Sequence, residues 1–276
     1  MVVPEAVMMD ALHGRVNEVR AWLDNSPPNA VNDVDENGHT LLYYCCFTCG
    51  IYRWAEQKQV FTDEHYQLAQ YLLSRGADVS RGIPAHNVTP LHAVASRGAQ
   101  NSSPMASLLI SAKAELNAVE SHGETPLAKA IVSLEYEGRV GSCWLRRGNN
   151  NEGPLDVIVC LLRGGVSLDS VCPSGASRDS ARIAVESLMQ SKEVYGPYRN
   201  SLRRDRHWIA CKEMVAGVRK YGSWKAYRRA PHKSILRLRS LFVRGRAKTA
   251  DRRLARIANL PNGPCWRVLA FWRAAD

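Results

Sequence analysis

The chain has 276 residues, of which 45% are hydrophobic, which is enough to build the core of one large domain or two ordinary ones. Its formal net charge of +11 is unevenly spread: residues 199–276 contain 21 Lys or Arg and 4 acids, against 16 basic and 22 acidic residues before them. There is no apolar run of about 18 residues and no basic segment followed by an apolar one at the N-terminus. We therefore expect no membrane association and an intracellular protein, cytoplasmic or nuclear.

Three short segments are copies of one another, and each predicts the start of a helix. The copies are Gly38–Leu42, Asn87–His92 and Gly123–Leu127. Gly permits positive φ in the turn, Thr can cap the free N–H groups of a helix, and Pro fits the first helical position. We expect helices to begin at Thr40, Thr89 and Thr125, with a degenerate fourth copy at Gly175–Ser177.

A second element follows each copy and predicts the end of a second helix. It occurs at Leu72–Val79, Leu109–Asn117 and Leu161–Leu168. Each is an apolar helical stripe, and in two of them Gly76 or Gly165 supplies the usual left-handed terminator. The sequence therefore predicts pairs of helices joined by turns.

This order of elements resembles the ankyrin repeat, in which a β-turn finger precedes two antiparallel helices. Ala11–Gly14, with Val19 and Leu23, resembles the half-repeat before the first finger, so the resemblance covers about residues 8–190. It implies an all-α fold: an ankyrin-repeat domain over residues 1–190, a solenoid of about four to five helix-pair repeats. A basic helical module over residues 195–276 is expected to follow.

The spacing of the copies predicts two long insertions. Thr40, Thr89, Thr125 and Ser177 are 49, 36 and 52 residues apart, whereas ankyrin repeats recur about every 33 residues. We place the excess at residues 50–63 and 135–152. These insertions either carry binding specificity or are tolerated surface loops without a role.

The cysteines and His92 are interpreted as structural. The eight cysteines are irregularly spaced, which favours reduced thiols. Alignment on Thr40 places Cys45 and Cys46 where the repeat has a pair of small core residues, so Cys46-x-x-Cys49 is more readily explained by packing than by a metal. His92 has the position at which the repeat hydrogen-bonds within its turn. We expect no catalytic residue, no metal site, no cofactor and no enzyme activity.

The resemblance implies a scaffold that holds another protein through its finger tips and first helices. The candidate contact residues lie on three fingers: Asp35, Asn37, His39, His86, Val88, Glu120, His122 and Glu124. The aromatic run Tyr43-Tyr44, with Phe47, Tyr52 and Trp54, is either an interface anchor or packs on the first insertion.

The basic C-terminal part continues the helical period. Trp208, Cys211, Val215 and Val218 form one apolar stripe. We expect Gly222–Tyr227 to break the chain and Arg228–Pro231 to open the next helix. Large Trp side chains supply surface for a small core, so this module would cap the repeats or recruit a second protein.

Two further functions are possible for this module. Residues 260–272 resemble the start of an F-box, which would make the chain a substrate receptor of a cullin-type ubiquitin ligase. The candidate adaptor-binding residues are Leu260, Pro261, Trp266, Val268 and Leu269. Alternatively, basic residues bind nucleic acid or a nuclear-import factor, or only solvate the outer helix faces. They are Arg199, Arg203, Arg204, Arg206, Arg228, Arg229, Lys233, Arg237 and Arg239.

Overall fold

The structure is a computed structural model that describes residues 2–47, 61–97, 102–137, 153–169, 183–196 and 199–244. Its helices are α1 (Glu5–Leu12), α2 (Val16–Asp24), the 3-10 helix η1 (Pro28–Asn32), α3 (Leu41–Cys46), α4 (Asp63–Ser74), α5 (Pro90–Arg97), α6 (Ser102–Ser111), α7 (Pro126–Glu137), α8 (Pro154–Gly164), α9 (Val185–Tyr195), α10 (Arg199–Leu202), α11 (Arg206–Tyr221) and α12 (Trp224–Val243). No β-strand occurs within these ranges, so the predicted all-α class is confirmed for the described part of the chain.

The chain divides into two compact units, Met1–Val215 and Ala216–Asp276. The division falls inside α11, whereas the charge composition of the sequence changes near residue 195.

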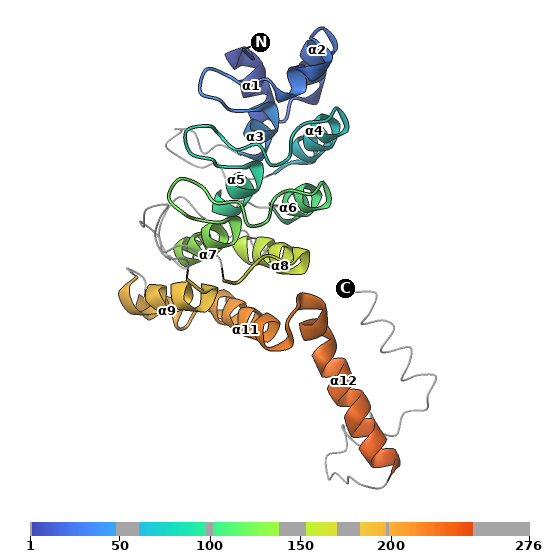
Figure 1. Cartoon of the computed structure of the whole chain (residues 1–276), viewed down its shortest axis with the longest axis vertical. Coiled ribbons are helices and arrows are strands. Elements are labelled where there is room, and N and C mark those ends of the chain that lie inside the picture. The colour runs from blue at the N-terminus through green and yellow to red at the C-terminus, as the bar shows by residue number, and fades with distance from the viewer. Residues whose placement is uncertain are drawn as a thin grey trace. The chain divides into compact units, whose positions relative to one another are not determined.

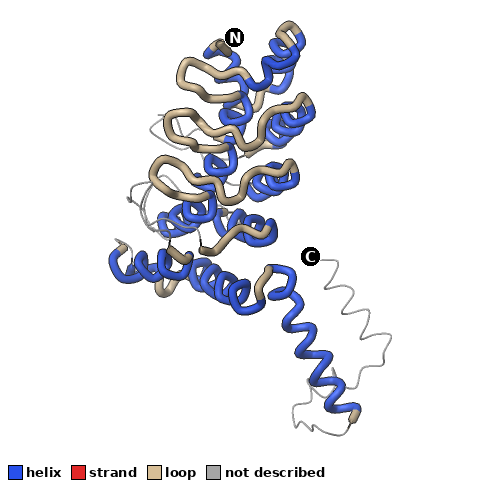
Figure 2. The backbone as a smooth tube through the Cα atoms, in the orientation of Figure 1, coloured by secondary structure: helices blue, strands red, loops and turns tan. Residues whose placement is uncertain are grey.

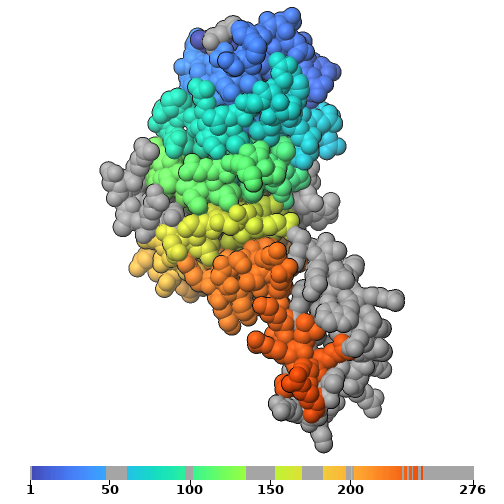
Figure 3. All heavy atoms as spheres, turned by 45° about the vertical axis from the view of Figure 1, so that its right-hand side comes forward, coloured from blue at the N-terminus to red at the C-terminus, as the bar shows by residue number. Residues whose placement is uncertain are grey.

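In the first unit, the helices form successive pairs that lie one on the next. Within the pairs, α1 packs on α2, α3 on α4, α5 on α6 and α7 on α8. The first members α1, α3, α5 and α7 contact one another in turn, and so do the second members α2, α4, α6 and α8 (Figure 1). Figure 3 shows these pairs as layers of colour from blue to yellow. Each pair therefore covers an apolar face that its neighbour would otherwise expose.

The predicted helix starts are confirmed. Thr40 precedes α3, Thr89 precedes α5 and Thr125 precedes α7. Each Thr hydroxyl accepts the backbone N–H three residues later, at 3.1 Å, 3.4 Å and 3.3 Å respectively. These bonds satisfy one of the N–H groups that the start of a helix leaves without a partner. The fourth copy, Gly175–Ser177, and most of the two expected insertions lie outside the described residues.

The ends of the second helices use left-handed backbone. Gly76 after α4 and Gly165 after α8 both have φ of +87°, as the terminator pattern predicts. At the corresponding place after α6, Lys113 has φ of +70°. A non-glycine residue in this region costs about 1 kcal/mol, so the third helix pair ends less favourably than its neighbours.

The core of the first unit repeats along the stack. Leu42, Leu91 and Leu127, each two residues after the Thr of its copy, are completely buried. Burial of each such side chain contributes about 2 kcal/mol. Cys45 and Cys46 are also completely buried and are free thiols, which confirms the packing interpretation of this pair. Cys49 lies outside the described residues.

One expectation about the C-terminal helices is wrong. The break between α11 and α12 is only two residues long, Gly222 and Ser223, and α12 begins at Trp224 instead of at Arg228. Ser223 caps this helix, because its hydroxyl accepts the backbone N–H of Ala226 at 3.2 Å. Pro231 therefore lies inside α12 and not at its start. The local cap at Ser223 decides the start of this helix.

The apolar stripe of α11 is confirmed. Trp208, Cys211, Val215 and Val218 are all buried. In the first unit, the Trp208 indole N–H donates to the Glu193 carboxylate at 2.9 Å, so the ring is buried with its polar atom satisfied.

Candidate protein-binding surface

Three fingers precede the first helices, and Figure 2 shows the loops that carry them, in tan, on one side of the first unit. The first finger (residues 35–39) and the third finger (residues 120–124) have the same turn. In the first, the Asp35 N–H donates to the His39 carbonyl at 3.0 Å, and the Gly38 N–H donates to the Asp35 carbonyl at 3.1 Å. The same two bonds join Glu120, Gly123 and Glu124 at 3.1 Å and 2.9 Å. Gly38 and Gly123 have φ near +80°, which explains the glycine in both copies.

The middle finger (residues 83–88) closes differently. Its Asn87 takes the left-handed conformation, with φ of +52°, in the turn whose ends are joined by the Ile83 N–H and the Val88 carbonyl at 3.2 Å. Asn is one of the few side chains that adopt this conformation readily. The turn therefore forms without the glycine that the other fingers use.

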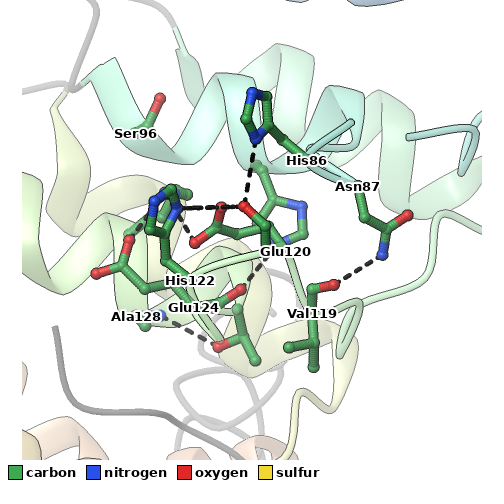
Figure 4. Close-up of polar contacts among 12 residues, drawn as sticks. His86, Asn87, Ser96, Val119, Glu120, His122, Glu124 and Ala128 are labelled. Carbon is green, nitrogen blue, oxygen red and sulfur yellow. Dashed lines mark hydrogen bonds and ion pairs between the residues drawn. The ribbon is translucent and has the colours of Figure 1, made fainter. Parts of the chain in front are cut away.

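The middle and third fingers are joined by one backbone bond and one side-chain bond. The Ser121 N–H donates to the His86 carbonyl at 2.8 Å, and the Asn87 side-chain amide donates to the Val119 carbonyl at 2.7 Å (Figure 4). The first finger also approaches the middle one closely, because a Cβ added to Gly38 would meet Pro84 at 2.6 Å. The finger tips are thus held at fixed positions relative to one another.

In the first finger, a carboxylate organises a histidine and a tyrosine. The Asp35 side chain accepts from the His39 ring nitrogen Nδ1 at 3.0 Å and from the Tyr44 hydroxyl at 3.1 Å. Burial raises the pKa of Asp35, but hydrogen bonds from the amide and ring of His39 and from the Asn37 amide outweigh it, so the pKa lies below its ordinary value. Asp35 is therefore an anion that fixes the orientation of the His39 ring.

Aromatic rings continue from this finger along α3. The His39 ring stacks on Tyr43 with centroids 5.2 Å apart, and Tyr43 stacks on Phe47 at 5.4 Å. Burial, with the Asp35 charge and hydrogen bond, raises the pKa of Tyr44 to about 12. Tyr43 is buried and Tyr44 is half-buried, so these two rings pack beneath the first finger and contact its His39 and Asp35 side chains. Tyr52 and Trp54 lie outside the described residues.

The third finger contains a buried carboxylate beneath an exposed histidine. Glu120 is only 1% exposed, and its Oε2 accepts from His122 Nδ1 at 3.0 Å (Figure 4). Its other oxygen, Oε1, is 3.7 Å from the Lys129 ammonium and has no hydrogen-bond partner. Lys129 instead donates to Glu124 at 2.8 Å. Burial raises the pKa of Glu120, but the His122 hydrogen bond and the Lys129 charge outweigh it and hold the pKa below its ordinary value.

The predicted contact residues differ in how accessible they are. Asn37, His86 and His122 are exposed, and Asp35, His39, Val88 and Glu124 are partly exposed. The prediction that Glu120 is a contact residue is wrong. Its buried carboxylate orients His122 and does not itself reach the surface. We call the seven accessible residues the finger surface. They are Asp35, Asn37, His39, His86, Val88, His122 and Glu124.

His92 is a structural histidine, as predicted. Its Nδ1 accepts from the Thr89 N–H at 3.2 Å, and its Nε2 donates to the Glu124 carbonyl at 3.1 Å, so it joins the middle repeat to the third finger. The structure shows an equivalent that the sequence analysis missed. His65 bonds to the Thr62 N–H at 3.4 Å and to the Leu12 carbonyl at 3.0 Å. The Thr-x-x-His spacing was the signal that could have found it.

The roles of Tyr44 and Lys129 were also missed. Each lies five residues after the last residue of its finger, which places it in the first turn of the following helix, within reach of that finger. This short separation was the available signal. The candidate adaptor-binding segment, with Leu260, Pro261, Trp266, Val268 and Leu269, lies outside the described residues.

Three of the described thiols lie in unreactive surroundings. Burial raises the pKa of Cys45 to about 12 and that of Cys211 to about 12, and it raises the pKa of Cys46 well above its ordinary value. Within the described ranges, no three His, Cys, Asp or Glu side chains are grouped so that they could hold a metal ion. Among the described helices, none has both the length and the hydrophobicity needed to cross a lipid bilayer.

Comparison of the sequence with protein-family models and with curated proteins found no match.

Proposed function

We propose that the chain is an ankyrin-repeat protein that binds another protein through the finger surface. The stacked helix pairs, the fingers before Thr40, Thr89 and Thr125, and the His92 link between repeats support this assignment. In such a scaffold the buried residues hold the fold while the tips vary, so the tips are the natural place for recognition. The proposed role is binding and not catalysis.

The observation that carries the proposal is the pair of exposed histidines on neighbouring fingers. His86 and His122 are both exposed, and the Ser121 hydroxyl lies 3.4 Å from Nδ1 of the first and 3.3 Å from Nδ1 of the second. The Ser121–His86 backbone bond fixes the spacing of the two tips. A partner would bind these rings without first having to order the loops that carry them, which reduces the entropy lost on binding.

The finger surface fits a polar protein partner. It offers imidazole rings, the Asn37 amide and the Glu124 carboxylate, with the Lys129 ammonium close behind. Such groups exchange hydrogen bonds with a folded surface or an extended segment, as at ordinary protein interfaces. Partner recognition would therefore depend on shape and hydrogen bonding more than on burial of the partner in an apolar pocket.

Site-specific photo-crosslinking tests this proposal. A photoreactive amino acid would replace His86 or His122 in the full chain, and Gln70, which is exposed on the second helix α4, would be the matched control position. We expect one protein band from a cell extract to be crosslinked at positions 86 and 122 and not at position 70. The same band at all three positions, or at position 70 alone, would contradict the proposal.

Affinity measurement with the crosslinked partner gives the second test. The triple variant Asn37→Ala, His86→Ala, His122→Ala should bind at least about tenfold more weakly, because it removes the exposed side chains of all three tips. The control variant Gln70→Ala, Ser74→Ala changes exposed residues of α4 and should bind as the unmodified protein does. Equal loss of binding in both variants would place the interface elsewhere.

A further inference from the structure

Helix α12 in the second unit carries a row of exposed basic side chains and has no acidic residue over its whole length, Trp224–Val243. The row is spaced by four residues and consists of Lys225, Arg229, Lys233 and Arg237, all of them exposed. Residues at this spacing lie on one face of a helix, about 6 Å apart along its axis. The four cations therefore form a line about 18 Å long on a single helix face.

Within the described residues, no carboxylate makes an ion pair with any of these four side chains. Like charges four residues apart on a helix repel one another and weaken it. An anion with several charges in a row would relieve this repulsion, whereas a single acidic side chain would meet only one member of the row. The row thus fits a polyanion.

The packing of α12 favours nucleic acid over a lipid surface. The face opposite the row is already covered in the first half of the helix, because the Tyr227 ring lies directly against Gly217 of α11 and Ala230 is buried. Tyr227 also contacts the rings of Tyr221 and Trp224, with centroids 6.5 Å and 5.7 Å away. A helix that binds a bilayer inserts its apolar face, and in the first half of α12 that face packs on the protein, although Leu241 in the second half is 40% exposed.

We propose that the basic face of α12 binds the phosphate backbone of a nucleic-acid duplex. Each strand of a duplex presents a phosphate about every 3.4 Å along the axis, a denser row of charge than the cations about 6 Å apart on α12, so phosphates are available along the whole row. The major groove of B-form DNA, about 12 Å wide, admits an α-helix between its two phosphate rows. Contacts of this kind bind without sequence preference. This activity is independent of the finger surface, so its failure would leave the proposed protein-binding function unaffected.

Fluorescence anisotropy with the full chain and a labelled DNA duplex of random sequence tests the proposal. Four phosphate contacts predict that affinity falls on the order of 100-fold between 50 and 200 mM salt. The variant K225Q/R229Q/K233Q/R237Q should bind at least about tenfold more weakly at 50 mM salt, with a shallower salt dependence. Binding that does not change with salt, or no binding at 50 mM salt, would overturn the proposal.

A control with the same loss of charge separates the row from general electrostatics. The variant R20Q/R81Q/K113Q/R163Q changes four exposed basic residues of the first unit and should bind DNA as the unmodified chain does. Equal weakening by both variants would overturn the proposal. Glutamine keeps good helix propensity, and circular dichroism checks that each variant is folded. If the quadruple α12 variant unfolds, K225Q and R237Q are measured singly, and each should lower the salt slope by about 1.

Two further probes identify the source of the phosphates. An RNA duplex that binds and competes with DNA supports recognition of the shared backbone, and binding to DNA alone supports insertion into the wider groove. Vesicles containing phosphatidylserine test the lipid alternative. Binding to vesicles without binding to either duplex would overturn the proposal.

Discussion

The segments Thr62–His65 and Thr89–His92 use the same side chains in the same way at two different places in the stack. In both, the Thr N–H donates to Nδ1 of the His ring, at 3.4 Å in the first and 3.2 Å in the second. Nε2 of the ring then donates to a distant carbonyl, that of Leu12 at 3.0 Å or that of Glu124 at 3.1 Å. Since Nδ1 accepts a bond from an N–H group, both rings are neutral in this arrangement.

The two segments differ in direction and in surroundings. The first begins α4 and ties this second helix back to the end of α1, whereas the second begins α5 and ties this first helix forward to the third finger. Thr62 is exposed, but Thr89 is only 2% exposed. Water can therefore replace a lost bond in one segment and not in the other. The same local motif thus has an effect on stability that depends on its depth in the protein.

Removal of each ring is the strongest test of this comparison. We expect His92→Ala to lower the free energy of unfolding by about 3 kcal/mol, because it leaves a cavity and a buried Thr89 N–H without a partner. His65→Ala should cost about half as much, because solvent reaches Thr62. Urea unfolding of both variants measures the difference. Equal losses would show that depth does not matter here.

Acid should act mainly through the deeper ring. Burial lowers the pKa of His92 to about 4, whereas an unfolded chain has a His pKa near 6.5. The unfolded state therefore binds more protons between these values, so stability is full above about pH 6.5 and falls by about 3 kcal/mol as the pH drops toward 4. Protonation also removes the Nδ1 acceptor of the Thr89 N–H.

Urea midpoints between pH 7 and pH 5 measure this effect before the carboxylates titrate. His92→Gln lacks the titrating ring and should show a shallower decline than the unmodified chain, while His65→Gln should lie between the two, since burial also lowers the pKa of His65. Parallel declines in all three proteins would assign the acid sensitivity to other groups.

Loss of the Thr hydroxyl should have a smaller effect. Thr89→Ala removes the hydroxyl that accepts from the backbone N–H of His92. It should cost about 1 kcal/mol, the usual value for a helix cap. Thr62→Ala, at the exposed segment, should cost about 0.5 kcal/mol. Thermal unfolding of the two variants measures the difference. A larger loss at Thr62 would reverse the ranking that burial predicts.

The exposed histidines of the fingers should affect the free energy of unfolding less than the buried His92 does. His86→Ala should change the free energy of unfolding by no more than about 0.5 kcal/mol, because its side chain is exposed. His122→Ala should cost about 1 to 2 kcal/mol, because it leaves the buried Glu120 carboxylate without the His122 hydrogen bond. The same variants should weaken binding of the crosslinked partner. A loss of about 3 kcal/mol in either variant would show that the finger histidines hold the fold, as His92 does, and would remove the basis of the proposed binding surface.

Local chemistry made the helix starts predictable. Thr40, Thr89 and Thr125 each accept an N–H three residues later, and Gly76 and Gly165 end helices in the left-handed conformation, all within one turn of the chain. The start of α12 was predicted four residues late because Pro231 was assigned to a helix start. Ser223 provides an equally local cap, and this competing signal decided the outcome.

Side-chain burial and contacts between repeats could not be predicted from the sequence. Glu120 occupies a finger tip and is charged, so the pattern predicts an exposed residue, yet its carboxylate is buried under His122. The insertion expected at residues 50–63 made the position of the second helix uncertain in the sequence, so the link from His65 to Leu12 was not recognised. The first depends on how the finger folds over its own carboxylate and the second on which residue the preceding helix pair brings into contact.

The sequence alone determined that this chain forms capped helices in repeated pairs, because capping bonds and the helical period involve residues only a few positions apart. The tertiary structure decided which histidines are buried, which carboxylate lacks a partner at Oε1, and how neighbouring fingers are bonded. Those properties arise when segments distant along the chain pack together and exclude water, and no local pattern encodes that exclusion.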